Sequence, residues 1–350
     1  MRDYQEEQPW LPFSEALLEW DDDFHELMLQ DRLRMAAYRK AIQETVRPGD
    51  VVLDLGTGTG ILSLWALQAG ASRVYGIDLS APVLARAVER MAQAGLADRF
   101  VPINQLSFDV SLPEQVDVLI SEIMGNMADN EDFQPILRDA IPRFLKAGGR
   151  VLPQSTATYL VPVAARQAHR SLVEREVSTL SPKYSMERLC REKGIRSPFN
   201  IYYDTILPRR TYLSRARCLY RYQGEWEQPP CYSVDVPYPV HKAEWMTGFK
   251  AYFVAQLSPS VTLDISGDDI GGGSTSASWK HAYLPIEHPL QVAEGDTVSV
   301  RFSRFYPDAG ARFRQIYRWQ GEVLRAGNVI AQFDQCMDES LTVSPEVVSG

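Results

Sequence analysis

The chain has 350 residues, enough for two domains with real cores, and its 45% hydrophobic and 23% charged residues are ordinary for a globular protein. Its net charge of −9 argues against a nucleic-acid-binding protein that relies on bulk charge, and it suits a cationic substrate. The 4 cysteines are scattered, without the spacing of a metal site or a disulfide framework, so we expect no metal and a cytoplasmic location. A polar, acidic N-terminus and the lack of an apolar run of about 18 residues predict neither a signal peptide nor a membrane span.

The first 45 residues are expected to form an N-terminal helical segment or lid. Acidic residues at Asp21–Asp23 can cap a helix of roughly residues 24–45. Along it, Met28, Asp31 and Arg34 follow at a spacing that makes successive members neighbours on the helix. Spacing alone favours a solvated Asp–Arg pair.

A glycine-rich turn follows a short strand of buried type, in the stretch VVLDLGTGTG. Glycines let the backbone adopt φ > 0 and approach a ligand closely, and the next helix points its N-terminal amides at that ligand. Asp54 precedes glycines at Gly56, Gly58 and Gly60, a pattern that differs from the dinucleotide fingerprint. A dehydrogenase is therefore the weakest interpretation, and the alternative without function is an α/β turn with accidental glycines.

A second strand, VYGIDLS, ends at Asp78. A carboxylate there can accept hydrogen bonds from both ribose hydroxyls of a nucleotide. Together, the turn and this acid resemble the S-adenosylmethionine (SAM) site of class I methyltransferases.

The order of the expected elements predicts two domains. Strands alternate with helices over residues 46–153, which predicts a parallel sheet whose ligand lies at the carboxyl ends of its strands. Over residues 154–350 the strands follow one another with turns between them, which predicts an antiparallel sandwich or barrel. A helical stretch at about 171–194 is expected to be either an arm that makes a homodimer or an insertion folded back on its own domain.

Two glutamates frame a loop after the fourth expected strand, in the stretch SEIMGNMADNE. Glu122 lies at the end of the strand, and Glu131 follows after the loop. Two carboxylates in a cleft can do glycosidase-like acid–base work, bind a metal, or clamp a planar guanidinium through paired hydrogen bonds. A SAM-binding fold makes the guanidinium clamp the most economical interpretation, and the alternative is a surface loop with unremarkable acids.

This loop resembles the double-glutamate loop of the protein arginine methyltransferase family. The residues of this loop that match the family in type and spacing are Ser121, Glu122, Met124, Gly125 and Glu131. The stretches DLGTGTGILS, GIDLS and HELMLQDRLRMAAYR resemble that family's SAM motifs and N-terminal active-site helix. The chain looks like a divergent, bacterial-looking member.

The resemblance implies a Rossmann-like SAM-binding domain, then an antiparallel β-barrel domain with a helical arm, and a head-to-tail homodimer. It implies that Met28 lies near the methyl group, that Arg34 binds the SAM carboxylate and that Asp78 binds the ribose. With Asp31, Met28 joins the two glutamates as an expected catalytic residue.

The chain departs from the family at several places, and two of them concern expected site residues. Ala277-Ser278-Trp279 stands where the family has Thr-His-Trp, so the histidine that would pair with Asp31 is missing, and the nearest in sequence is His281. Ser107 and Phe108 fill the positions of an adenine-contacting acid. The residues expected on the substrate side are Met124, Asp129, Trp279 and His281.

These observations predict a SAM-dependent N-methyltransferase that acts on the guanidino nitrogen of arginine. The substrate is either arginine in a protein or free L-arginine or a small guanidine. A polar loop rim at Asn126, Asp129 and Asn130 suits the free amino acid, whose α-ammonium Asp129 would meet. The alternative is a catalytically silent partner that activates another subunit, which the two glutamates argue against. The number of methyl groups and their symmetry stay open.

Overall fold

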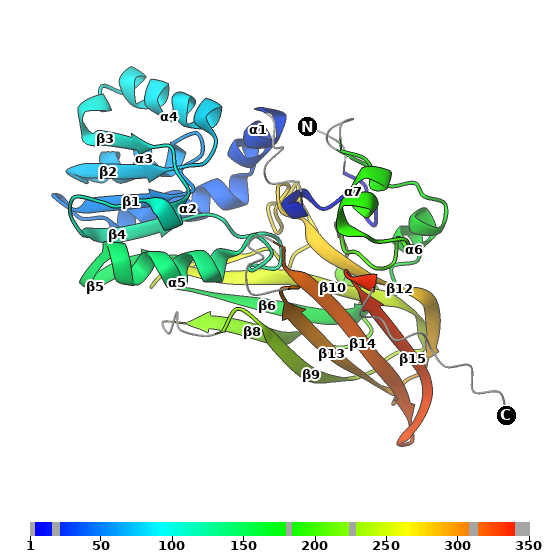
Figure 1. Cartoon of the computed structure of the whole chain (residues 1–350). Coiled ribbons are helices and arrows are strands. Elements are labelled where there is room, and N and C mark those ends of the chain that lie inside the picture. The colour runs from blue at the N-terminus through cyan, green and yellow to red at the C-terminus, as the bar shows by residue number, and fades with distance from the viewer. Residues whose placement is uncertain (1–3, 16–21, 180–183, 224–228, 308–313, 340–350) are drawn as a thin grey trace.

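A parallel β-sheet forms the first part of the computed structural model, which describes residues 4–15, 22–179, 184–223, 229–307 and 314–339 (Figure 1). Its strand order is β3-β2-β1-β4-β5, and the strands pair in parallel. The strands are β1 (Val51–Leu55), β2 (Arg73–Ile77), β3 (Phe100–Ile103), β4 (Val116–Ser121) and β5 (Leu145–Leu152). The helices between them are α3 (Ile61–Gln68), α4 (Ala81–Gln93), the short η2 (Ala97–Arg99) and η3 (Ser107–Asp109), and α5 (Phe133–Phe144). The predicted Rossmann-like alternation is confirmed.

Two N-terminal helices stand where one was predicted. They are α1 (Asp22–Gln30) and α2 (Arg32–Thr45), and Asp31 separates them. Its backbone is extended (φ −71°, ψ 99°), and its carboxylate caps α2 by accepting a hydrogen bond from the Arg34 amide. The single helix over residues 24–45 is therefore wrong, because an aspartate that can cap a helix start interrupts it.

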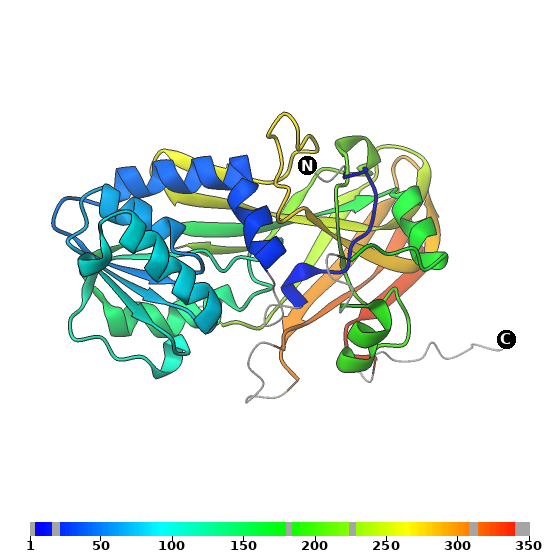
Figure 2. The same cartoon turned by 90° about the horizontal axis from the view of Figure 1, so that it is seen from above.

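Ahead of α1, the N-terminal segment crosses to the β-rich part of the chain (Figure 2). Its backbone exchanges hydrogen bonds with Asp204 through Trp10, at 2.8 and 3.0 Å. The predicted lid over the first 20 residues lies partly outside the described residues. What is described packs against the β strands rather than standing free.

Antiparallel sheets follow, as predicted. The larger has the order β7-β12-β10-β6-β8, with β11 paired to β10, and the smaller has the order β15-β14-β13-β9. Strands β8 and β9, and strands β12 and β15, bring the two sheets together around one apolar core. No ladder joins the two sheets within the described residues, so the predicted β-barrel is not closed, and the name barrel is kept below for this two-sheet part. The strands are β6 (Ser155–Val163), β7 (Tyr203–Thr205), β8 (Arg217–Gln223), β9 (Tyr232–Pro239), β10 (Glu244–Ser258), β11 (Val261–Asp264), β12 (His281–Val292), β13 (Thr297–Phe305), β14 (Ile316–Arg325) and β15 (Asn328–Cys336).

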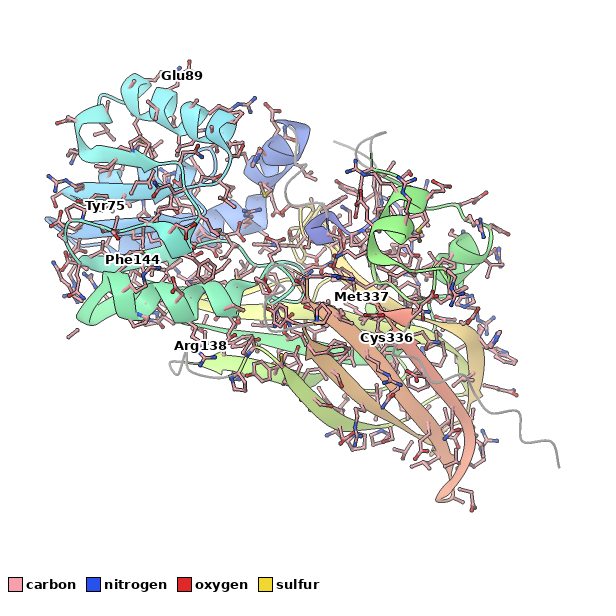
Figure 3. The ribbon with its side chains drawn as sticks, viewed as in Figure 1. Tyr75, Glu89, Arg138, Phe144, Cys336 and Met337 are labelled. Carbon is pink, nitrogen blue, oxygen red and sulfur yellow. The ribbon has the colours of Figure 1, made fainter. Side chains whose placement is uncertain are left out.

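Apolar side chains fill one core in the barrel and another around the parallel sheet. In the barrel, Cys336 and Met337 at the end of β15 are buried, while Phe144 at the end of α5 is buried beneath the parallel sheet (Figure 3). Strand β10 contributes to both cores, since Phe249 packs in the barrel and Phe253 packs with the parallel sheet. The two apolar cores therefore meet along one strand.

The expected arm at 171–194 contains the end of α6 (Arg166–Val173) and all of α7 (Met186–Lys193), with η4 (Arg209–Thr211) farther along the chain. Leu172 and Leu189 are buried in the barrel core, whereas the Val173 side chain is 63% exposed. Leu180, another apolar residue of this stretch, lies outside the described residues. Much of the segment's apolar surface thus packs on its own chain, and the homodimer stays a prediction. The domain boundaries predicted at residues 45 and 153 also stay predictions. Among the described residues, no helix is long and apolar enough to span a membrane.

Candidate active site

A cavity of about 640 Å³ opens at the carboxyl ends of β1, β2 and β4, where they face the β-barrel. It brings together residues from both parts of the chain. Its predicted site residues are Met28, Arg34, Gly56, Gly58, Asp78, Ser107, Glu122, Met124, Glu131 and Trp279. Six others that were predicted do not line it, namely Asp31, Asp54, Gly60, Phe108, Asp129 and His281.

The glycine turn leaves open space above its backbone. Gly56, Gly58 and Gly60 have φ of 76°, 52° and 77°, values that L side chains rarely adopt. A Cβ atom on Gly58 would meet no atom within 4 Å, and this residue lines the cavity. The turn therefore offers a ligand close approach to the backbone, as a SAM site requires. Gly60 contributes differently, because it lies at the start of α3, and a Cβ atom there would be 2.7 Å from the Ala87 side chain.

Two carboxylates hold the glycine turn in place. Asp78 accepts hydrogen bonds from the amides of Gly58 and Ser80, both at 2.8 Å, and still lines the cavity. Asp54 is buried under the turn and accepts hydrogen bonds from Thr57 Oγ1 at 2.8 Å and Ser63 Oγ at 2.6 Å. Burial raises the pKa of Asp54 to about 6. Asp54 thus supports the site from behind instead of facing a ligand.

Glu131 is one of the two glutamates that reach the cavity. Ser14 Oγ donates a hydrogen bond to its Oε1 at 2.9 Å. Burial raises the pKa of Glu131 to about 7, although Ser14 and the charge of Arg34 both oppose the rise. The carboxyl group is therefore poised to change its charge near neutral pH.

Glu122 reaches the same cavity and makes an ion pair with Arg34 Nη2. The Arg34 guanidinium also lies 4.8 Å from the centre of the Trp279 ring. A carboxylate and an aromatic face thus already surround a guanidinium at this place. In this structure Glu122 is thus paired with a guanidinium of its own chain, and its role toward a substrate guanidinium stays a prediction.

Serine hydroxyls take the position expected for a histidine at Asp31. Ser278 donates to Asp31 Oδ2 from its Oγ at 2.8 Å and from its amide at 3.0 Å, and Ser276 Oγ also donates to this oxygen. Asp31 is buried, so it acts through these bonds and its cap of α2. The sequence interpretation missed both serines, although each stands next to the Ala277 that marks the departure from the family.

Trp279 lies between the cavity and the double-glutamate loop. Its Nε1 donates a hydrogen bond to the Met124 carbonyl, and its ring packs edge-on against Phe253 at 4.9 Å between centroids. The following His281 faces away. Its Nδ1 accepts from the Leu207 amide at 3.0 Å, and burial lowers its pKa well below the usual value, so its predicted contact with substrate is wrong.

The predicted role of Asp129 in substrate binding is also wrong. Its side chain is fully buried, and its oxygens accept hydrogen bonds from Tyr232 and Tyr317, each at 2.7 Å. Asn126 and Asn130 are buried as well, and Asn130 Nδ2 donates to Asn126 Oδ1 at 3.0 Å. Of the predicted polar rim, only Asn126 lines the cavity, while Asp129 and Asn130 belong to an interior network. The argument for a free amino acid depended on Asp129 and therefore loses its support.

Other charged residues in the cavity escaped the sequence interpretation. Asp204 on β7 accepts from Asn126 Nδ2 at 2.7 Å and from the Phe13 amide at 2.9 Å, and burial raises its pKa to about 7. Glu15 makes an ion pair with Lys193 of α7. No local motif marks these residues, because segments far apart in the sequence bring them together.

Phe108 is half-buried and packs against the core of the parallel sheet, whereas Ser107 beside it lines the cavity. Of this predicted pair, the structure brings Ser107 to the site and leaves Phe108 behind it.

Two family models match the chain, each over a different part. Residues 38–152 match the ribosomal protein L11 methyltransferase family, and residues 155–323 match the PRMT5 oligomerisation domain.

Named relatives come from plants. A probable protein arginine N-methyltransferase 6 of Arabidopsis thaliana is 41% identical over 142 residues, which are 40% of this chain but 32% of that protein. The chain therefore spans about a third of that relative. Rice (Oryza sativa subsp. japonica) protein arginine N-methyltransferase PRMT10 is 28% identical over 307 residues, 79% of each chain. These relatives give no support to a bacterial-looking origin.

Solved structures share the fold. The Trypanosoma brucei PRMT1 enzyme–prozyme heterotetrameric complex with AdoHcy superposes with a TM-score of 0.72 at 21% identity, over 89% of this chain and 96% of that one. Arabidopsis thaliana protein arginine methyltransferase 10 gives 0.72 at 20% identity, over 89% and 97%. A SAM-type glycine turn, two glutamates on one cavity, the order of the domains and these relatives agree, and by all of them the chain is similar to the protein arginine methyltransferase family.

Proposed function

We propose that this chain is a SAM-dependent N-methyltransferase that methylates a guanidino nitrogen of arginine. The observation that carries the proposal is the presence of Glu122 and Glu131 on one cavity with the glycine turn and Asp78. Bound SAM would supply an electrophilic methyl group on its sulfonium. Asp78, Gly58 and Arg34 are the residues that would hold it, through the ribose, the open backbone and the carboxylate.

The glutamates act on the substrate. As carboxylates they accept hydrogen bonds from the guanidinium and oppose delocalisation of its positive charge, which leaves electron density on the nitrogen that attacks. Burial of both groups strengthens this interaction, because water screens it less. Trp279 and Met28 border the same space and orient the arginine side chain toward the methyl group.

Arginine in a protein is the substrate that we favour. The relatives are named for that substrate, and the polar rim that suited free arginine is buried. An incubation with SAM decides between them. Mass spectrometry is expected to find methylated arginine in an Arg-Gly-rich peptide and to find free L-arginine unchanged. Methylation of neither substrate would contradict the proposal.

The silent-partner alternative has one point of support. The Trypanosoma structure contains a prozyme as well as an enzyme. The intact pair of glutamates in this chain argues for the enzyme, because a partner without activity has no need of a buried guanidinium clamp. A homodimer and a cytoplasmic location are part of the proposal and stay predictions.

The activity is expected to fall as the pH drops below about 7. A protonated Glu131 cannot accept the guanidinium, and burial raises its pKa to about 7. Asp204, with a pKa also raised to about 7, lines the same cavity. The loss of activity at low pH is therefore expected to report the protonation of both groups together. The measurement is kcat/KM for the peptide between about pH 5.5 and 8. Calorimetry with SAM over the same range is the control, and a flat kcat/KM profile would contradict the expected titration.

Asp78→Ala is expected to weaken SAM binding by about 1–3 kcal/mol, because the ribose hydroxyls lose a charged acceptor. The substitution also releases the Gly58 amide, which Asp78 now holds at 2.8 Å. Isothermal calorimetry measures the loss, with Asp98→Ala as a matched control, since Asp98 is an exposed acid of the same part of the chain. Unchanged affinity in a folded Asp78→Ala variant would remove this residue from the SAM site.

A further inference from the structure

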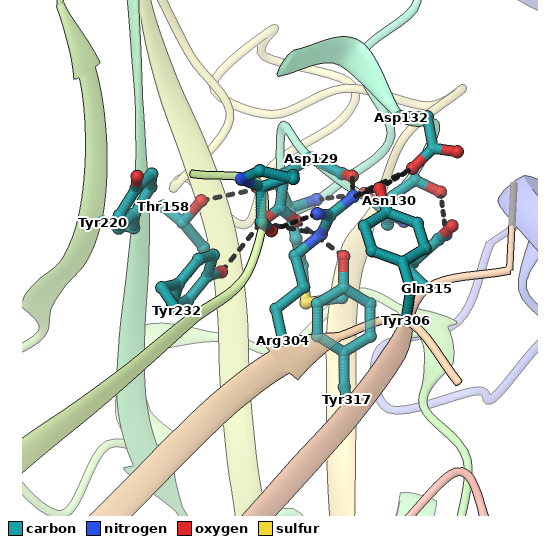
Figure 4. Close-up of polar contacts among 12 residues, drawn as sticks. Asp129, Asn130, Asp132, Thr158, Tyr220, Tyr232, Arg304, Tyr306, Gln315 and Tyr317 are labelled. Atoms are coloured by element: carbon teal, nitrogen blue, oxygen red, sulfur yellow. Dashed lines mark hydrogen bonds and ion pairs between the residues drawn. The ribbon is translucent and has the colours of Figure 1, made fainter. Parts of the chain in front are cut away.

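We propose that Arg304 and Asp129, from a buried polar cluster beneath the double-glutamate loop, are positioning residues that fix Glu131 for catalysis. The inference rests on the proposed function, because it assumes that Glu131 binds the guanidinium. The cluster comprises Asp129, Asp132, Tyr232, Arg304, Tyr306 and Tyr317 (Figure 4).

Arg304 holds the loop on both sides of Glu131. It projects from β13, and its side chain is fully buried. Its Nη2 donates to the Asp129 carbonyl and to Asp132 Oδ1, each at 3.0 Å. Asp132 follows Glu131 directly, and Asp129 precedes it by two residues. One guanidinium from the barrel therefore contacts the backbone before Glu131 and the side chain after it.

Asp129 completes the attachment. Its Oδ2 lies 3.5 Å from Arg304 Nε, and its two oxygens accept hydrogen bonds from Tyr232 of β9 and Tyr317 of β14. Strands β9, β13 and β14 are neighbours in the smaller sheet, so three adjacent strands converge on one carboxylate. Figure 4 shows the two tyrosine hydroxyls and the guanidinium pointing at Asp129.

A further hydrogen bond holds Asn130, which lies between Asp129 and Glu131. Gln315 Nε2 donates to the Asn130 carbonyl at 2.6 Å. The barrel thus contacts Asp129, Asn130 and Asp132, which flank Glu131, while Glu131 itself is left to face the cavity. This is the arrangement expected if the sheet fixes a loop and the loop presents one carboxylate.

The loop needs such support because its backbone is unusual. Ala128 and Asp132 have φ of 65° and 56°, in the left-handed region that residues other than glycine seldom occupy. Such conformations persist where the surroundings hold them, and they are common at active sites. Arg304 contacts Asp132 itself and the carbonyl of Asp129, which follows Ala128. The cluster therefore restrains the backbone at both positions.

Stability alone gives a poorer account of the cluster. Removing an arginine and an aspartate from water is costly, and apolar residues of similar volume often stabilise a core as well as a buried ion pair does. Directional hydrogen bonds to named carbonyls, by contrast, define where a loop lies. These directional hydrogen bonds therefore suit a cluster whose role is to place Glu131.

The test is Arg304→Met, an apolar replacement of similar length, with Arg301→Met as its control. Arg301 lies on the same strand and pairs with Asp235 of β9, but on the exposed side. We expect Arg304→Met to lower kcat on the arginine peptide by about 100-fold, the effect of a displacement of about 1 Å, and to raise the KM for the peptide. SAM affinity and the number of SAM sites per chain, from calorimetry, stay at the wild-type values. Arg304→Lys, which keeps the charge, is expected to recover part of the rate, and Arg301→Met to change nothing.

The outcomes separate the two proposals. A wild-type enzyme that methylates no arginine overturns the proposed function and this inference with it. An active wild type with an equally active Arg304→Met variant overturns the inference alone. A rate that falls only in proportion to the number of SAM sites indicates lost folding of Arg304→Met, and Tyr317→Phe then decides. This variant removes one hydroxyl from Asp129 and is expected to lower kcat by about tenfold with SAM binding unchanged. Wild-type kcat in a folded Tyr317→Phe variant would overturn the inference.

Discussion

Glu131→Gln is expected to lower turnover on an arginine substrate by orders of magnitude while SAM affinity stays nearly the same. The amide keeps the size of the side chain but removes its negative charge, so the lost rate reports the electrostatic clamp rather than packing. In place of a carboxylate that accepts through both oxygens, the variant presents one acceptor and one donor to a guanidinium that only donates. Because Glu131 is only partly exposed, little water is present to take over the lost interaction.

Two measurements check this expectation, namely kcat with the Arg-Gly-rich peptide and the Kd of SAM. Glu114→Gln is the matched control, since Glu114 is an exposed glutamate that pairs with Arg73 at the surface. Its turnover is expected to equal that of the wild type. Near-wild-type turnover in Glu131→Gln would mean that this residue does not carry the guanidinium.

Glu122→Gln is expected to have an effect of similar size by a related route. In the proposed clamp Glu122 accepts hydrogen bonds from the other edge of the guanidinium, so the loss of its charge would remove half of the clamp. The structure adds a second consequence, because Glu122 also pairs with Arg34. Neutralising Glu122 leaves Arg34 free to bind the SAM carboxylate, so SAM affinity is expected to hold or to increase.

The direction of the change in SAM affinity tests the role of Glu122. If SAM binding weakens in step with the rate, Glu122 acts by placing Arg34 and not by binding the substrate. If binding holds while kcat falls, the two glutamates act as a pair. The double variant with both glutamines is then expected to lose little more than either single variant, as residues that work as a unit do.

Local patterns predicted several of the residues that line the cavity. The glycine turn and Asp78 reach the cavity, because the parallel sheet brings the ends of β1 and β2 to one edge. The glutamates were predicted for a similar reason, since Glu122 directly follows β4. In each case the residue lies next to the element that places it, so a short stretch of sequence contains the information.

Asp129 shows why the rest could not be predicted. Its partners Tyr232 and Tyr317 are more than a hundred residues away in sequence and come from β9 and β14. The sequence predicts strands over residues 154–350 but not how they pair, so nothing indicated that a sheet lies beneath the loop. An acid in a loop between a strand and a helix normally faces water. Here contacts over a long separation decide its place, and no local pattern reveals them.

The serines at Asp31 are an intermediate case. The missing histidine was visible in the sequence, and so was the expectation that Asp31 has a partner. Ser276 and Ser278 lie within two residues of Ala277, but the chain had to turn tightly to bring both hydroxyls to one carboxylate oxygen. Sequence indicated where a partner was needed, and only the geometry showed which side chains provide it.

Strand β10 bears on how the molecule unfolds. Phe249 packs in the barrel core, whereas Phe253 and Leu257 pack with the parallel sheet, so a single strand belongs to both apolar cores. Unfolding of either core would expose apolar surface of the other to water. The two parts of this chain are therefore one cooperative unit, unlike domains joined by an exposed linker, which melt separately. Neither part, cut from the other, would keep its full apolar core.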